Sequence, residues 1–392
     1  RDYLEAGQTA GLADIRAALH DSAVLLSWFD AGDRYLCLAL RRNGLFGFET
    51  PRDSALEQAV LNFQTALSDK AAQERDPAVF FAAAWFLKQR LLPDSILRGT
   101  NALAIAPDGA LAYLPVEVLL TQPHRGPYST APYLLRSHRV QYLWSAALLA
   151  APKGARESRS EWLQVAPFVP AGRRGLAPLP NSLRELPEDG PSEVWQGEQA
   201  VAGAFLEQAA NYGLLHLSTH AHAGGGAEPG IEMYDRAVGL SEIYGQRLQA
   251  QLVALSACET GTGAFAGGEG VLSLARAFAY AGAQSLVASY WSVPDRSTAD
   301  LFTEFYRQLG AGQTRSEALR QAKLALLRQA GPDARKAPFY WAAFTLSGAD
   351  GPVELPVGRA YFWWVLALGL AAGLLGWWWW WWRQTFQAEK LG

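Results

Sequence analysis

Short apolar runs separated by polar turns dominate the second half of the chain. Two of them, 214–220 and 252–258, are continuous rather than alternating and too short for a stable helix. Such runs are typical of strands buried on both faces of a parallel sheet. The pattern continues with a predicted strand at 285–292, helices at 298–309 and 318–328, and a last strand at 339–346. Strands and helices in this order predict a doubly wound, mostly parallel α/β unit.

The first half of the chain has a different pattern. Apolar runs at 23–29, 34–40 and 45–48, broken by charged turns, predict an antiparallel meander. Helical spacing follows over 54–92. Strands are then predicted at 102–106 and 111–120, joined by the turn Pro107-Asp108-Gly109.

A proline-rich stretch separates the two patterns, with seven prolines between 152 and 191, and a strand is predicted within it at 162–166. We therefore divide the chain into six parts. They are the end of an upstream region at 1–20, a non-catalytic half at 21–150, a linker at 151–200, a catalytic half at 201–350, an apolar helix at 361–382, and a tail at 383–392.

Two of the predicted strands end in residues that carry chemistry. The run at 214–220 ends in His220, and the run at 252–258 ends in Cys258, 38 residues later. Ligands and catalytic groups gather at the carboxyl edge of such sheets, where neighbouring parallel strands end together. A thiol beside an imidazole is the catalytic pair of a cysteine hydrolase.

Composition narrows the class of protein. Half of the 392 residues are apolar and 18% are charged, so a sizeable core is expected. The formal net charge is −3 without a basic run, which argues against a nucleic-acid partner. Cys37 and Cys258 are the only cysteines, so a disulfide framework is excluded, and Cys37 is assigned to the core. The chain begins with Arg1 rather than Met, and we expect a region upstream of it.

The segment 361–382 holds 22 residues without a charge, close to the length that crosses a bilayer. Aromatic residues gather at both ends, including the six tryptophans 377–382, as in an interfacial belt. We predict a transmembrane helix, with a buried core helix as the alternative. Gly369 and Gly373 form a GxxxG pattern that would suit a homodimer in the bilayer. The prediction is a single-pass protein of a bacterial inner membrane whose catalytic part faces the cytoplasm.

Five motifs of the second half, taken together, resemble the CHAT domain. They are His-Leu-Ser-Thr-His (216–220), Leu-Ser-Ala-Cys-Glu-Thr-Gly (255–261), Gly-Gly-Glu-Gly (267–270), Ala-Arg-Ala-Phe (275–278) and Pro-Phe-Tyr-Trp-Ala-Ala-Phe (338–344). This family is a caspase-like cysteine peptidase unit related to separases and often follows tetratricopeptide repeats. The resemblance covers about 20–348. It implies a caspase-like fold with a non-catalytic first half, a protein or peptide substrate, and an upstream repeat or adaptor region.

The resemblance also implies roles for individual residues. His220 would be the general base and Cys258 the nucleophile of an endopeptidase that forms an acyl-enzyme. The backbone N–H groups of Cys258 and Ala221 would form the oxyanion hole. Relatives commonly have Gly after the catalytic His, so Ala221 would carry strain if that position needed a positive φ.

Two acidic residues have weaker assignments. Asp295 resembles the separase residue that reads a basic P1 side chain, and the alternative is that it caps the next helix. Glu269 would support the catalytic loop, or would simply lie favourably at a helix N-terminus. The caspase signature Gln-Ala-Cys-Arg-Gly is absent, so cleavage after Asp is not implied. Arg173 and Arg174 could form a self-processing site or lie in a solvated loop.

Other classes of function stay open. A metal site at His216, His220 and His222 lacks a supporting carboxylate or cysteine cluster, so no metal and no cofactor are predicted. The main alternative to a peptidase is a catalytically silent caspase-like scaffold or signalling module at the membrane. The separation of the His220 and Cys258 side chains, and access to them, would distinguish the two.

Overall fold

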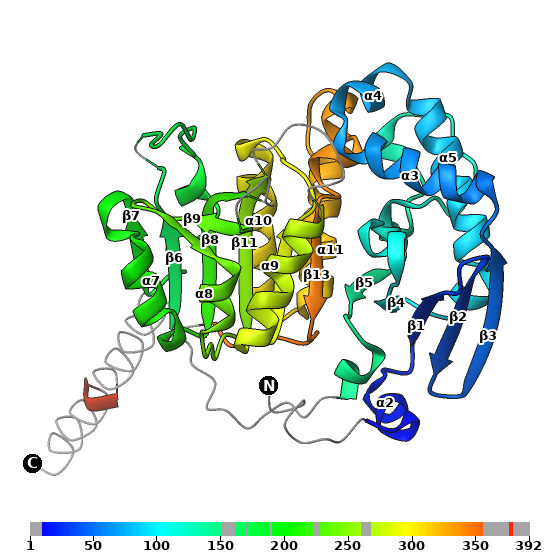
Figure 1. Cartoon of the computed structure of the whole chain (residues 1–392), viewed down its shortest axis with the longest axis horizontal. Helices are drawn as coiled ribbons and strands as arrows, with labels where there is room; N and C mark the ends of the chain where they lie inside the picture. Colours follow the sequence, from blue (N-terminus) through cyan, green and yellow to red (C-terminus); the bar gives the residue numbers. More distant parts are fainter. Residues whose placement is uncertain are drawn as a thin grey trace, which may run out of the picture.

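The computed structural model describes residues 10–150, 161–169, 171–187, 190–222, 228–259, 268–355 and 376–378, with side chains at all of these except 257–259 and 268–273. Within these residues thirteen strands form one sheet, and helices cover both of its faces (Figure 1). The strands of the first half are β1 (Ala23–Asp30), β2 (Arg34–Arg41), β3 (Gly44–Pro51), β4 (Ala102–Ala106) and β5 (Arg139–Tyr142). Those of the second half are β6 (Trp162–Ala166), β7 (Glu193–Gln196), β8 (Leu214–His222), β9 (Gly230–Glu232), β10 (Ala237–Gly239), β11 (Leu252–Glu259), β12 (Ser285–Ser289) and β13 (Phe344–Gly348).

The first half combines an antiparallel meander with parallel strands. β1, β2 and β3 pair in succession as antiparallel neighbours, as predicted from the charged turns between them. β4 then lies parallel to β1, and β5 lies parallel to β4. The inner face of the meander is apolar, since Tyr35, Cys37 and Ala39 of β2 are all buried.

Aspartates set where the helices of the first half begin. The helices are α2 (Leu12–Ala18), α3 (Ser54–Ser68), α4 (Lys70–Arg75), α5 (Pro77–Leu91) and α6 (Asp94–Leu97). Asp53, Asp69 and Asp76 each accept a hydrogen bond from a backbone N–H of the first turn that follows. Caps of this kind satisfy N–H groups that have no partner inside the helix. The predicted helical stretch 54–92 is therefore three helices rather than one.

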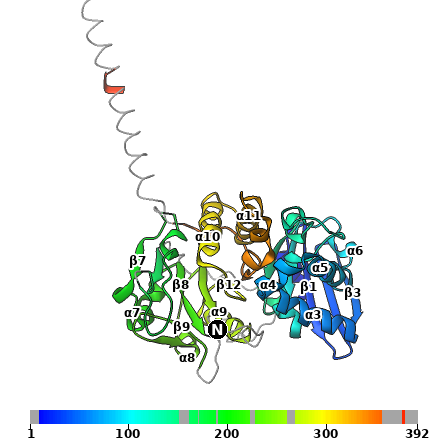
Figure 2. The ribbon, with the colours of Figure 1, turned by 90° about the horizontal axis from the view of Figure 1, so that it is seen from above.

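The second half is a mostly parallel part of the sheet between two helical layers, in which β9, β10 and β13 pair as antiparallel strands. Its helices are α7 (Ala202–Gln208), α8 (Leu240–Tyr244), α9 (Gly268–Ala281), α10 (Asp295–Gly310) and α11 (Arg315–Arg328). Figure 2 shows α10 and α11 on one face of the strands and α8 and α9 on the other. Alternate residues of β11 supply the two cores, since Leu252 and Ala254 belong to one apolar cluster and Val253 and Leu255 to the other. Burial on both faces explains the continuous apolar runs.

The two halves meet where β5 pairs with β13 at a single register position, Tyr142 with Ser347. A buried ion pair reinforces this junction. Lys323 of α11 lies 2.7 Å from the Glu117 carboxylate, which also accepts the Tyr142 hydroxyl, and both charged side chains are at most 4% exposed. At the surface, Asp333 accepts the backbone N–H groups of Tyr128 and Ser129.

Several predicted elements differ from the structure. The expected strand at 111–120 is instead two short 3₁₀ turns, Gly109–Tyr113 and Val116–Val118, on either side of Leu114 and Pro115. Its apolar residues are buried as expected, but in an irregular segment. The predicted linker 151–200 contributes both β6 and β7 to the sheet. Helix α10 begins three residues earlier than predicted, and the last strand begins at Phe344 rather than 339.

The membrane prediction was wrong. In the described part of the chain, no helix has both the length and the apolar character needed to cross a bilayer, so a single-pass membrane protein is not supported. Of the predicted span 361–382, only the helical residues Gly376–Trp378 are described. Gly369 and Gly373 lie outside the described residues, and nothing in the described part supports a lipid partner or a dimer formed through them.

The buried pair at the junction predicts a large stability effect. Glu117→Ala leaves the Lys323 ammonium and the Tyr142 hydroxyl buried without their acceptor, and we expect it to lower the free energy of unfolding by about 3–5 kcal/mol. Glu49→Ala, which removes the exposed partner of Arg34, should cost below about 1 kcal/mol. Urea denaturation followed by tryptophan fluorescence measures both. Equal losses would contradict this reading of the junction, as would a Glu117→Leu, Lys323→Met double variant less stable than Glu117→Ala.

Candidate active site

Two adjacent strands bring the predicted dyad positions together. β8 and β11 are parallel, and their register runs from Leu214 opposite Leu252 to Ala221 opposite Glu259. In this register Cys258 lies opposite His220, at the carboxyl ends of both strands. Neighbouring strands are about 4.8 Å apart, so the two backbones are adjacent. The thiol of Cys258 is not among the described side chains.

The imidazole of His220 is held in one orientation. Its ring is 3% exposed and lies against Phe168, with 5.1 Å between ring centroids. Nε2 is 2.8 Å from the backbone oxygen of Ala177. A carbonyl only accepts, so Nε2 carries the hydrogen. In the neutral ring Nδ1 then keeps its lone pair, and among the described residues it has no hydrogen-bond partner. This tautomer can take a proton at Nδ1.

The loop that carries Ala177 is anchored at several points beyond it. The backbone N–H of Leu179 donates to Phe168, and the side chain of Gln164 donates to the oxygen of Ser182. The backbone N–H and the side-chain amide of Asn181 both donate to Asp295 Oδ2. The carbonyl that orients His220 therefore belongs to a segment tied to β6 and to α10.

A second histidine on the same face of β8 is hydrogen-bonded to the segment that carries Ala177. His216 is fully buried, with Nε2 2.6 Å from Glu185 Oε2 and Nδ1 2.8 Å from the Tyr306 hydroxyl. Burial raises the pKa of Tyr306 well above its usual range, so its O–H stays protonated and donates to Nδ1. The hydroxyl of Ser218 donates to the same Glu185 oxygen. Both ring nitrogens of His216 are thus used within the protein, which argues against its serving as a metal ligand.

His222, the third member of the considered metal site, also has protein partners. Its Nε2 is 2.9 Å from the backbone oxygen of Glu228, and its Nδ1 is 3.2 Å from a Glu232 carboxylate oxygen. His216 and His222 thus contact neighbouring segments, whereas Nδ1 of His222, like that of His220, makes no hydrogen bond to the described residues.

Asp295 has a contact that the sequence did not reveal. It is the first residue of α10, and the N-cap position before it, Pro294, makes no side-chain cap. Oδ2 accepts both donors of Asn181, while Oδ1 accepts no hydrogen bond from the described residues. Asp295 is thus an anchor of the Ala177 loop. Its pairing with a basic P1 side chain stays a prediction.

The remaining predicted site residues occupy less informative positions. Ala221 lies in β8 with Glu259 on one side and Ile231 on the other. Among the described residues Arg174 is the only non-glycine with a positive φ, so Ala221 carries no strain of that kind. Its role in an oxyanion hole stays a prediction. Glu269 lies in the first turn of α9, and its side chain is outside the described set.

The predicted self-processing site contacts the end of β9. Arg174 donates to the backbone oxygen of Met233 at 2.7 Å and pairs with Glu232. The guanidinium of Arg173 lies 4.3 Å from the ring centroid of Tyr234. Both arginines are exposed yet engaged, and whether they are cleaved stays a prediction.

Sequence reasoning missed the Ala177 carbonyl, Asn181 and Glu185. The Ala177 carbonyl is a backbone group, and any residue type at that position would carry it. The other two contact residues more than 30 positions away, and they lie in a stretch whose prolines had suggested a linker.

Comparisons with known proteins identify the family of this chain. The CHAT domain family matches residues 82–349, which is more than half of the chain. Tetratricopeptide repeat protein 28 of Mus musculus is 31% identical over 123 residues, which make up 31% of this chain and 5% of that protein.

Two solved structures of the Saccharomyces cerevisiae separase–securin complex share the fold. Their TM-scores are 0.52 and 0.51 at 10% identity, over 86% of this chain and 31% and 30% of the matched chains. The chain therefore spans only a small part of the relatives that it matches. By its matched region this chain belongs to the CHAT domain family, and its α/β fold is similar to that of separase.

Proposed function

We propose that this chain is a cysteine endopeptidase in which His220 activates the thiol of Cys258. The observation that carries the proposal is the state of His220. Its Nε2–H is held by the Ala177 carbonyl, its Nδ1 has no partner among the described residues, and Cys258 is its register neighbour. The proposal requires the two side chains on one face of the sheet. Alternation along paired parallel strands predicts that arrangement.

The proposed reaction follows from these positions. Nδ1 of His220 takes the thiol proton, and the thiolate attacks the carbonyl carbon of the scissile peptide bond. The N–H groups of Cys258 and Ala221 are proposed to stabilise the oxyanion. His220 then protonates the leaving amine as the C–N bond breaks, which leaves a thioester on Cys258. Water, deprotonated by His220, hydrolyses the thioester and restores the thiol.

The Ala177 carbonyl assists at the step where the imidazole becomes charged. A backbone oxygen that accepts Nε2–H stabilises the imidazolium and prevents the ring from turning. The loop beyond it is fixed through Asn181 and Asp295, so we assign Asp295 a positioning role. The protein substrate and the side chain preferred at P1 are proposals that the sequence motif alone supports.

A second candidate, the silent scaffold, is favoured by one observation. Nδ1 of His220 is closed off from solvent. A peptidase with this geometry must open to admit a peptide, whereas a scaffold stays closed. Turnover and thiol labelling distinguish the two.

The dyad predicts the effect of removing either member. Cys258→Ala and His220→Ala should each lower cleavage of a quenched-fluorescence peptide library by about 10³-fold or more, because nucleophile and base act as one unit. Cys37→Ala, which removes the buried cysteine of β2, should keep most of the activity. Circular dichroism checks that each variant is folded. Turnover unchanged in Cys258→Ala would exclude the peptidase.

Thiol reactivity gives an activity-independent test. Burial raises the pKa of Cys37 to about 12, so this thiol stays neutral and unreactive through pH 9. A thiol beside an imidazolium has a pKa below its usual value of about 8.5. Iodoacetamide labelling of Cys258, followed by mass spectrometry between pH 5 and 9, should therefore rise with a midpoint below about 8.5 and shift upward in His220→Ala. No labelling at Cys258 in the folded chain would support the scaffold.

Substitution of Asp295 separates its two roles. If it anchors the loop, Asp295→Ala should lower kcat by about 10–100-fold whatever the P1 residue, because the support of Ala177 is lost. Asn181→Ala, which removes only the side-chain half of the same contact, should then give a smaller loss of the same kind. If Asp295 reads a basic P1 residue, its loss should act only on Arg and Lys substrates, and Asn181→Ala should have no such selectivity. Steady-state kinetics on matched peptides decide between the roles.

A further inference from the structure

A cleft of about 660 Å³ lies between the two halves, at the edge of the sheet opposite the dyad. It is lined by residues at or next to the amino ends of β1, β4, β5 and β12, among them Ala23, Ala102, Arg139 and Gln284. Along β11, Cys258 is six residues beyond Leu252, or about 20 Å at 3.3 Å per residue. The cleft is thus separate from the proposed peptidase site. Its volume lies in the range typical of small-molecule sites.

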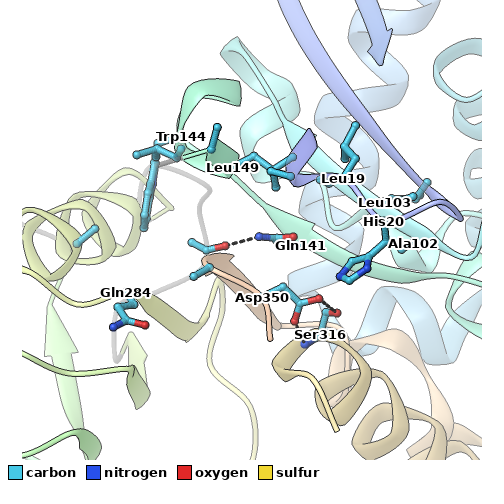
Figure 3. Close-up of a pocket in the computed structure, with 18 of the residues that line it drawn as sticks. Leu19, His20, Ala102, Leu103, Gln141, Trp144, Leu149, Gln284, Ser316 and Asp350 are labelled. Carbon is cyan, nitrogen blue, oxygen red and sulfur yellow. Dashed lines mark hydrogen bonds between the residues drawn. The ribbon is translucent and has the colours of Figure 1, made fainter. Parts of the chain in front are cut away.

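The walls of the cleft are mostly apolar and small. Alanines from both halves line it, including Ala104 of β4 and Ala279 of α9, and they leave the space that larger side chains would fill. In Figure 3 Trp144, Leu149 and Leu19 lie along one side of the space. This side is continuous with the apolar cluster beneath β1 and β4.

The opposite side of the cleft carries polar groups, labelled in Figure 3 as Gln141, Gln284, Ser316 and Asp350 with His20 beside them. Three of these, Gln141, Ser316 and Asp350, are already engaged. Gln141 Nε2 donates to the backbone oxygen of Gly348, and Asp350 accepts the backbone N–H and the hydroxyl of Ser316, at the start of α11. Gln141, Ser316 and Asp350 therefore offer few free hydrogen-bond donors to the acceptor atoms of a ligand.

Arg139 is the exception. Its side chain is 19% exposed, and its guanidinium donates no hydrogen bond to the described residues. Its buried Nε has no hydrogen-bond partner among the described residues and forms only a long ion pair with Asp350, at 3.9 Å. Leaving buried donors of a charged group unpaired costs free energy. A guanidinium presents a fork of donors that fits a carboxylate or sulfonate.

We propose that this cleft binds a small organic anion with an apolar body, whose acidic group pairs with Arg139 and whose body lies against Leu19, Leu149 and Trp144. Asp350 and Asp14 also line the cleft, where they accept hydrogen bonds from Ser316 and Gly11. The acidic group of the ligand must therefore compete with Asp350, whose Oδ2 lies 3.9 Å from Arg139 Nε, for the guanidinium. The proposal does not depend on peptidase activity.

The test uses the fluorescent anion 1-anilinonaphthalene-8-sulfonate and its uncharged relative N-phenyl-1-naphthylamine with the full chain. We expect saturable binding of the anion at one site. Arg139→Gln should raise its Kd at least tenfold and leave the Kd of the neutral probe within twofold. Ala279→Leu, which fills the cleft from a half-exposed helix position, should weaken both probes. Arg98→Gln, at an exposed arginine away from the cleft, should change neither.

Three results would overturn the proposal. The first is the absence of saturable binding. The second is an anion Kd that Arg139→Gln and Ala279→Leu leave within twofold. The third is binding lost instead in Leu38→Ser, which would place the probe on the exposed apolar face of β2. Circular dichroism of each variant separates loss of binding from loss of fold.

Discussion

The register between β8 and β11 is the constraint on which the candidate site depends. A slip of one residue would place Cys258 opposite Thr219 or Ala221 and turn every side chain of one strand to the other face of the sheet. Apolar residues alone resist such a slip weakly here, because both faces of these strands are buried. The polar positions of β8 specify the face, since His216 and Ser218 have their partners, Tyr306 and Glu185, on the α10 side.

The same polar positions connect the site to its loop. Burying a histidine, a glutamate and a tyrosine costs free energy unless each polar atom is paired. Here the pairs run from β8 to the segment that presents the Ala177 carbonyl to His220. The buried polar residues His216 and Glu185 thereby help to hold the Ala177 carbonyl against His220. An apolar core would stabilise the strands equally well but would leave this loop without its anchor.

Much of the fold could be predicted because strands buried on both faces are continuous apolar runs in the sequence. The strands β4 and β6 were predicted with their observed bounds, and β8 and β11 within two residues, since each is a continuous apolar run. The same pattern misled at 111–120, where Leu111 and Val118 are buried in 3₁₀ turns. An apolar run indicates that a segment is buried, but it does not indicate whether the segment is a strand or a turn. The Ala177 loop was beyond prediction for a different reason, because its contacts join residues far apart in sequence.

In the second half of the chain, the two ends of the strands have different chemistry but share two elements. β11 ends at the dyad edge, and the segment just before it, at Gln249, lines the cleft. α9 begins at Gly268, ten residues after Cys258, and the residues just beyond its other end, Gly282 and Ala283, line the cleft as well. Strands and helices packed in a dense core move as units rather than bending. The cleft and the candidate dyad thus lie at opposite ends of the same two elements, β11 and α9.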